Sequence, residues 1–150
     1  MEKIAVSACL LGRNCKYNGG NNRNEAVLVF CQGKQVIPVC PEVLAGLPTP
    51  RTPMELVKGR MTTRDGADVQ EAMEKAVETL LRQLQQEGVS RAVLQSRSPS
   101  CGVLQIYDGS FTGKKIEGSG LFAQRLKEAG FDLLDAEEIG SFQEKENMLK

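Results

Sequence analysis

The chain has 150 residues, of which 41% are hydrophobic and 25% are charged, and its 19 basic side chains balance 19 acidic ones. This composition is typical of one soluble domain with its own core, so we expect a single domain over residues 1–150, with a loose helical tail at 141–150. The zero net charge argues against nucleic acid as a partner, and the absence of a long apolar run or a leader pattern argues against a membrane and indicates a cytoplasmic protein.

Strands and helices are predicted to alternate along the chain. In chain order we expect a strand at 4–8, a helix at 25–30, a strand at 36–39, a helix at 69–87, a strand at 91–95, a hairpin at 106–111, a helix at 120–129, a strand at 131–134 and a final helical turn. This alternation predicts an α/β fold whose mostly parallel sheet is covered on both faces. Ligands of such folds bind beyond the carboxyl ends of the strands.

Two segments have clear boundary signals. The helix at 69–87 has apolar side chains at helical spacing, and Asp65 or Asp68 can cap its start while Gly88 ends it. Residues 46–53, with the sequence GLPTPRTP, contain too much proline for a helix or a central strand. We therefore expect a rigid loop over those eight residues.

The chain contains no histidine. Histidine is the usual general base near neutral pH and the commonest metal ligand. Its absence excludes nucleophiles activated by a Cys–His pair or a Ser–His–Asp triad, and it excludes zinc sites built on imidazole. Any chemistry must therefore use cysteine, carboxylate, hydroxyl or basic side chains, or a cofactor.

Three of the five cysteines, Cys9, Cys40 and Cys101, each close an apolar segment and open a loop. They are too far apart in sequence for a zinc ribbon or a ferredoxin motif, but a parallel sheet brings the carboxyl ends of its strands to one edge. Three thiolates there leave one coordination position free, which is the catalytic position in a zinc enzyme and a substrate-binding iron in an iron–sulfur cluster. Free cysteine is also a common core residue, so the pattern alone leaves packing open.

The remaining sequence features rank the five cysteines. Pro41 after Cys40 and Pro99 before Cys101 stiffen two of the loops, which suits a sulfur held at a fixed angle. By contrast, Cys31 ends a predicted helix, which indicates packing. Cys15 lies in a polar loop with no evident role, so we expect neither of these two to be a ligand.

Polar residues beside the three cysteines could take part in catalysis. Glu42 follows Cys40 by two residues and could move a proton for an attacking water, or could be an ordinary solvated carboxylate. Ser98 and Ser100 lie beside Cys101, where their hydroxyls could bind a substrate or only make turn hydrogen bonds.

Five segments together resemble the thiouracil desulfidase family (TudS), which was long catalogued as a domain of unknown function. The segments are SACLLG at 7–12, PVCPEVLAGLPTPRTPMEL at 38–56, SRSPSCG at 96–102, YDGSFTG at 107–113 and GSG at 118–120. The resemblance runs in order from residue 4 to about residue 134, which is nearly the whole chain. The PVCPE and SPSCG motifs are its most specific parts.

The resemblance implies a Rossmann-like, three-layer α/β domain in which three cysteines hold a 4Fe–4S cluster, with one iron free of protein ligands. These ligands fall on Cys9, Cys40 and Cys101, and the family's catalytic glutamate and serine fall on Glu42 and Ser98. The implied activity is a non-redox, hydrolytic desulfuration of a thionated pyrimidine, of the 2-thiouracil or 4-thiouracil type, with release of sulfide. The implied partner is that small molecule, and the oligomeric state stays undetermined.

The chain departs from the family pattern outside the implied ligands. Asn18 stands where the family has the aspartate of a YDG motif, Gln95 where it has lysine and Gln70 where it has threonine. In addition, GLFA at 120–123 replaces GVTA. These differences concern the substrate pocket, so they leave the exact substrate undetermined.

Two other functions stay open on the sequence alone. Three thiolates could bind zinc or act as a thiol redox module without catalysis. Gly118 and Gly120 precede a predicted helix and could cradle an anion, either as part of the substrate or in a small nucleotide-binding domain. Glycines in such a short motif more often only form a turn.

Overall fold

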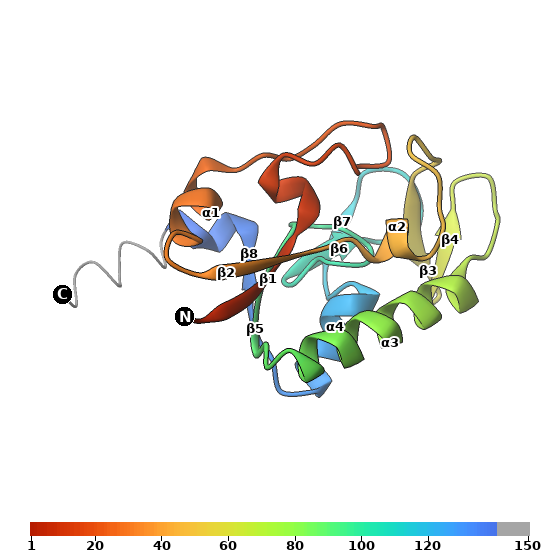
Figure 1. Ribbon diagram of the computed structural model, residues 1–150. Coiled ribbons are helices and arrows are strands. Elements are labelled where there is room, and N and C mark those ends of the chain that lie inside the picture. The colour runs from red at the N-terminus through yellow and green to blue at the C-terminus, as the bar shows by residue number, and fades with distance from the viewer. Residues whose placement is uncertain (141–150) are drawn as a thin grey trace.

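Four parallel strands form the main sheet of the computed structural model, which describes residues 1–140 (Figure 1). The strands are β1 (Lys3–Ser7), β2 (Gln35–Val39), β5 (Arg91–Leu94) and β8 (Asp132–Asp135). Their order across the sheet is β2-β1-β5-β8, and each neighbouring pair is parallel. The predicted α/β class and parallel sheet are confirmed, whereas the expected tail at 141–150 lies outside the described residues.

Helices cover both faces of this sheet, giving three layers (Figure 1). The helices are α1 (Glu25–Phe30), α2 (Pro41–Leu44), α3 (Gln70–Gln86) and α4 (Leu121–Glu128). On one face, α3 and α4 contribute Met73, Leu84 and Phe122 to a buried apolar cluster. On the other face, α1 contributes Val27 and Phe30 to a second cluster. No helix in residues 1–140 is both long and apolar enough to cross a membrane.

Strand β1 lies between the two clusters because its apolar residues point alternately to both faces. Ile4 and Val6 pack in the cluster that contains α1, and Ala5 packs in the cluster that contains α3 and α4. Burial on both faces is the reason for a continuous apolar run in a central parallel strand. Pro38, which cannot donate to the ladder, is tolerated in β2 because β2 is an edge strand.

The boundaries of α3 follow its sequence signals. The Asp68 carboxylate accepts a hydrogen bond from the Gln70 amide at 2.9 Å, which satisfies one free donor of the first turn. Gly88, with φ +76°, ends the helix in a left-handed conformation that glycine adopts readily. Gly88 thus ends the helix as predicted, whereas the N-cap residue is Val69 and Asp68 satisfies the Gln70 amide from one position before it.

Short elements near the carboxyl ends of the sheet were not predicted correctly. The expected hairpin at 106–111 consists instead of β6 (Gln105–Tyr107) and β7 (Lys115–Glu117), joined by a longer loop. A second hairpin, β3 (Met54–Val57) with β4 (Arg60–Thr63), and the four-residue α2 were not predicted at all. Such segments are too short to show a clear hydrophobic period. Two 3-10 turns follow strands, η1 (Ala8–Leu11) after β1 and η2 (Ala136–Glu138) after β8.

Candidate functional site

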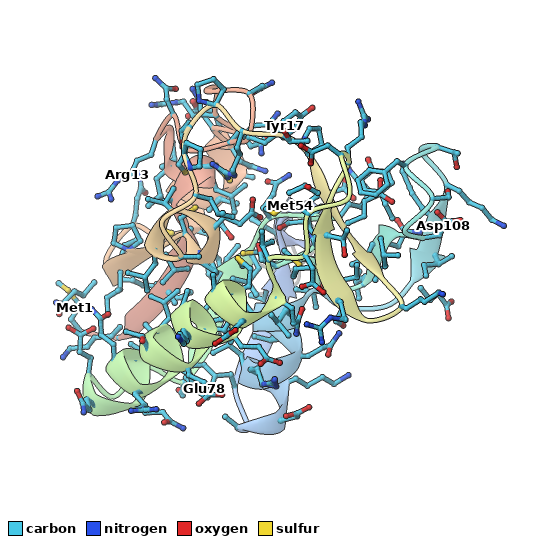
Figure 2. All side chains as sticks on the ribbon, turned by 90° about the vertical axis from the view of Figure 1, so that its right-hand side faces the viewer. Met1, Arg13, Tyr17, Met54, Glu78 and Asp108 are labelled. Carbon is cyan, nitrogen blue, oxygen red and sulfur yellow. The ribbon has the colours of Figure 1, made fainter. Side chains whose placement is uncertain are left out.

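A cavity of about 420 Å³ opens at the carboxyl ends of the strands. The chain passes from β1 to its neighbour β2, and after β2 it crosses back to β5 on the other side of β1, so the strand order reverses at β1. Crevices at such switch points are the usual ligand sites of parallel sheets. Figure 2 labels two residues of the cavity wall from distant segments, Tyr17 in the loop after β1 and Met54 at the start of β3.

The three cysteines selected from the sequence all line this cavity. Cys9 lies on η1 directly after β1, and Cys40 is the N-cap residue of α2 directly after β2. Cys101 comes from the loop that follows β5. The fold therefore brings together three sulfur atoms from distant parts of the chain, as the placement of cysteines at strand ends predicts.

The local environment holds each sulfur differently. The Asn22 side-chain amide donates to Cys9 Sγ at 3.7 Å, and the Asn22 backbone amide donates to the Cys9 carbonyl at 3.0 Å. Cys101 is buried, and the Ser100 hydroxyl lies 3.9 Å from its Sγ. Asn22 therefore orients the side chain of Cys9 through its sulfur atom, whereas Cys101 is held by its burial.

The pKa of the Cys9 thiol and that of the Cys101 thiol depend on burial and on the charge of the neighbouring cysteines. Burial raises the pKa of the Cys101 thiol, and negative charge on Cys40, Cys9 or Glu42 raises it further, although a hydrogen bond with Ser7 lowers it. Burial likewise raises the pKa of Cys9, with a further increase from Cys40 and an opposing hydrogen bond from Asn22. Grouped thiolates are thus unstable without a nearby cation, and metal binding to them would release protons.

The other two cysteines, Cys15 and Cys31, lie in different surroundings. Cys31 packs in the apolar cluster beside α1, as expected for a core residue. Cys15, for which no role is predicted from the sequence, lines the cavity with the other three. Burial, together with the neighbouring Cys40 and Cys9, raises its pKa to about 12. The cavity therefore contains a fourth sulfur that sequence reasoning did not connect with the site.

No group of three or more Cys, Asp or Glu side chains within residues 1–140 converges closely enough to hold a single metal ion. Ligands of a polynuclear cluster lie further apart than ligands of one ion, because the cluster itself fills the space between them. The arrangement of these cysteines thus gives no support to a mononuclear zinc site.

Glu42 lies beside the cysteines and is nearly buried, with 12% of its side chain exposed. It lies in the first turn of α2, and its Oε1 accepts from Arg51, whose Nε and Nη2 are 3.1 Å and 3.0 Å away. Its other oxygen, Oε2, accepts a hydrogen bond of 2.9 Å from the Ser100 hydroxyl. The Glu42 carboxylate therefore lies in the cavity wall, where Arg51 and Ser100 fix its orientation, and it is not an ordinary solvated side chain.

A chain of hydroxyls runs from Glu42 to Ser98. Ser98 Oγ accepts from the backbone amides of Ser100 at 3.2 Å and Cys101 at 3.0 Å, and lies 3.0 Å from Ser100 Oγ. A hydroxyl has one proton to donate. Because Ser100 donates its proton to Glu42, Ser98 must be the donor to Ser100. The direction of both hydrogen bonds is therefore fixed, and both serines belong to the site.

The loop that carries these serines is anchored at several points. The Ser7 hydroxyl accepts from the Gln95 amide at 2.9 Å, and the Ser96 hydroxyl donates to the buried Asp135 carboxylate. Arg97 forms a two-pronged ion pair with Glu137 at 2.7 Å and 3.0 Å. Arg97 also has a positive φ of +61°, an uncommon conformation for a non-glycine residue. Contacts at the ends of three strands, β1, β5 and β8, thus hold this short segment.

Gly118 and Gly120 have a structural role instead of forming part of the cavity wall. The backbone amides of residues 120–124, at the start of α4, all donate to protein carbonyls, including those of Pro99 and Ser100. These contacts leave the helix start without the free amides that an anion cradle requires. The start of α4 instead binds the loop that presents Ser98, Ser100 and Cys101, so the interpretation of these glycines as an anion site is wrong.

Gly120 allows this close contact, which leads to a testable prediction. A Cβ at this position would lie 2.5 Å from the Ser100 carbonyl carbon and 2.6 Å from its oxygen. We expect Gly120→Ala to lower the free energy of unfolding by about 1–3 kcal/mol, as other overpacked sites do. Denaturant titration would measure the change. Gly140→Ala is the control, because a Cβ there meets nothing within 4 Å, and an equal loss in both variants would contradict the packing argument.

Glu55 explains why the hairpin prediction failed. Its buried carboxylate on β3 accepts from the backbone amides of Gly109 at 2.9 Å and Phe111 at 3.2 Å. These bonds hold the loop after β6 open, so Asp108 and Gly109 do not form the tight turn that their sequence favours. The same contacts bring Phe111 into the cavity wall, where Tyr107 also lies.

Comparison with known proteins agrees with these observations. The family described as 2-thiouracil desulfurase matches residues 4–138. YbbK of Bacillus subtilis (strain 168), which is described as uncharacterized, is 36% identical over 146 residues, covering 91% of this chain and 97% of YbbK. The solved structure of a 4Fe–4S-dependent thiouracil desulfidase, TudS, has a TM-score of 0.87 and 32% identity, and the match covers 99% of each chain. Because the family model matches most of its length, the chain belongs to the 2-thiouracil desulfurase family.

Proposed function

We propose that this chain is an iron–sulfur enzyme that converts a thionated pyrimidine, of the 2-thiouracil or 4-thiouracil type, into its oxo form with release of sulfide. Cys9, Cys40 and Cys101 hold a 4Fe–4S cluster in this proposal, and one iron has no protein ligand. The observation that carries the proposal is the convergence of these three cysteines on one cavity that also contains the paired Glu42 carboxylate. The 4Fe–4S-dependent thiouracil desulfidase TudS, similar over nearly the whole chain, supports it.

The donor set of the cavity fits such a cluster. Thiolates are the ligands that iron–sulfur clusters use, and the cavity offers several thiols and no imidazole. Cys15 stays outside the ligand set because the implied family ligands number three. When bound, the cluster would supply an iron that accepts a soft thione sulfur in preference to a carbonyl oxygen.

The residues of the chain supply proton transfer and orientation. Glu42 takes a proton from the attacking water and later returns it to a ring nitrogen, which gives up its own proton to the departing sulfide, so the protons balance. Ser98 holds the edge of the pyrimidine, since its hydroxyl is aligned by two backbone amides. Phe111 and Tyr107 give the same cavity an aromatic wall against which a pyrimidine ring can pack.

The overall reaction balances without an external oxidant or reductant. The thiocarbonyl group and one water give a carbonyl group and hydrogen sulfide, and no electron is gained or lost. Water must therefore be the source of the new oxygen. This distinguishes the proposal from a redox module, which exchanges electrons with a partner.

Anaerobic purification followed by metal analysis tests the proposal. We expect brown protein with about four iron and about four acid-labile sulfide per chain. It should release sulfide from 2-thiouracil or 4-thiouracil with no added reductant, and in ¹⁸O-labelled water the product should gain one labelled oxygen. Colourless protein with zinc would favour the metal module. A brown protein that releases sulfide from neither compound would contradict the proposed activity.

A further inference from the structure

We propose that Arg51 is a positioning residue that fixes the Glu42 carboxylate so that Oε2 is the oxygen that exchanges the proton, an inference that rests on the proposed function. Arg51 lies in the Pro-rich loop between α2 and β3, where the sequence predicts only a rigid connection. Its side chain is nevertheless almost fully buried, with 7% exposed. A buried arginine inside a cavity wall calls for a specific role.

The contacts of the guanidinium indicate what this role is. Nε and Nη2 lie 3.1 Å and 3.0 Å from Glu42 Oε1, and Nη2 also donates to the Cys15 carbonyl at 2.9 Å. Nη1 donates to Thr49 Oγ1 at 3.0 Å and to the Pro48 carbonyl at 3.4 Å. A guanidinium has five N–H donors, and four of them are used in these hydrogen bonds, while Nη2 also lies within ion-pair distance of Glu42. The guanidinium is therefore directed at groups of the protein, and we infer that Arg51 acts through Glu42.

The two oxygens of Glu42 become different as a result. Oε1 faces two nitrogens of Arg51, whereas Oε2 receives only the Ser100 hydroxyl. Oε2 thus retains a free lone pair and lies at the end of the hydroxyl chain from Ser98. Without the guanidinium, the Glu42 carboxylate could rotate and exchange its two oxygens, and Oε2 would no longer be held beside the hydroxyls of Ser100 and Ser98.

Arg51 also connects two segments that carry cavity cysteines. Its backbone amide donates to the Tyr17 carbonyl at 2.6 Å, and its side chain binds the Cys15 carbonyl, so it fixes the loop after η1. At the same time it holds α2, which begins at Cys40. Lysine has a compact charge with three donors and no planar fork, so it cannot make this set of contacts.

Kinetics of four variants tests the inference, with all rates expressed per bound cluster. The variants are Arg51→Lys, Arg51→Gln, Glu42→Gln and the double variant Arg51→Gln/Glu42→Gln. We expect each Arg51 variant to lower kcat by about 10²-fold, as a misplaced catalytic group does. KM for the thionated pyrimidine and Kd for the uracil product should change by less than about threefold, because ground-state binding is untouched. The double variant should be no slower than Glu42→Gln alone.

Arg91→Gln is the matched control. Arg91 forms a comparable two-pronged pair with Glu2, at 2.9 Å and 2.9 Å, at the opposite ends of the strands. We expect Arg91→Gln to lower the free energy of unfolding and to leave kcat per cluster unchanged. Thr49→Val, which removes one anchor of the guanidinium, should give a smaller fall in kcat and carries the test if the Arg51 variants fail to fold.

Several results would overturn the inference. An unchanged kcat per cluster in Arg51→Gln, or in Thr49→Val when it alone folds, would leave Arg51 with only a structural role. A raised KM with normal kcat would make it a binding residue. A double variant much slower than Glu42→Gln would show that Arg51 acts independently of Glu42. Inactivity of the loaded wild-type protein refutes the proposed function itself, and this inference with it, before any variant is compared.

Discussion

Replacing Cys9, Cys40 or Cys101 by serine should remove most of the bound iron and all detectable desulfuration together. A serine hydroxyl is a poor ligand for a soft iron–sulfur centre, and each of the three side chains lines the same cavity. Iron and acid-labile sulfide analysis of anaerobically prepared protein measures the first effect. Sulfide release from thiouracil measures the second.

The two remaining cysteines are the controls. Cys31→Ala should keep wild-type iron content and activity, because Cys31 packs in the cluster beside α1 and lies outside the cavity. Cys15→Ser shares the cavity but not the proposed ligand role, so it should keep its iron as well. Equal iron loss in all five variants would refute the assignment of three ligands. Iron loss in Cys15→Ser alone among the controls would add Cys15 to the ligands.

Glu42→Gln should retain the cluster and lose turnover by about 10²–10⁴-fold, the usual contribution of a general base. Glutamine keeps an oxygen that can accept the Arg51 hydrogen bonds, so the loss of a buried ion pair is moderated, but it cannot take a proton. Iron content and kcat of the same preparation separate the two effects. An unchanged kcat would remove Glu42 from the mechanism.

Glu2→Gln is the matched control for Glu42→Gln. Glu2 also pairs with an arginine through two contacts of 2.9 Å, yet it lies near the amino end of β1, away from the cavity. It should therefore leave both iron content and kcat unchanged. A similar fall in kcat in the two variants would mean that the loss reflects general destabilisation rather than base catalysis.

Sequence patterns predicted the main sheet and its long helices because those elements are periodic and buried. The continuous apolar run in β1 and the helical spacing in α3 follow directly from the faces that each element packs against the core. The predictions failed at the short segments around the cavity. There a single distant contact, such as Glu55 with the Gly109 amide, outweighs the local preference for a tight turn.

By itself the sequence determined that the chain lacks histidine and that three cysteines follow strand segments, so their meeting at one sheet edge could be predicted. Only the tertiary structure decided which polar groups join them. Arg51 and Cys15 lie in irregular loops, whose path has no period and depends on long-range hydrogen bonds such as the one between Arg51 and the Cys15 carbonyl. Periodic elements encode their position in local spacing, whereas loop residues acquire their partners only when the whole chain has folded.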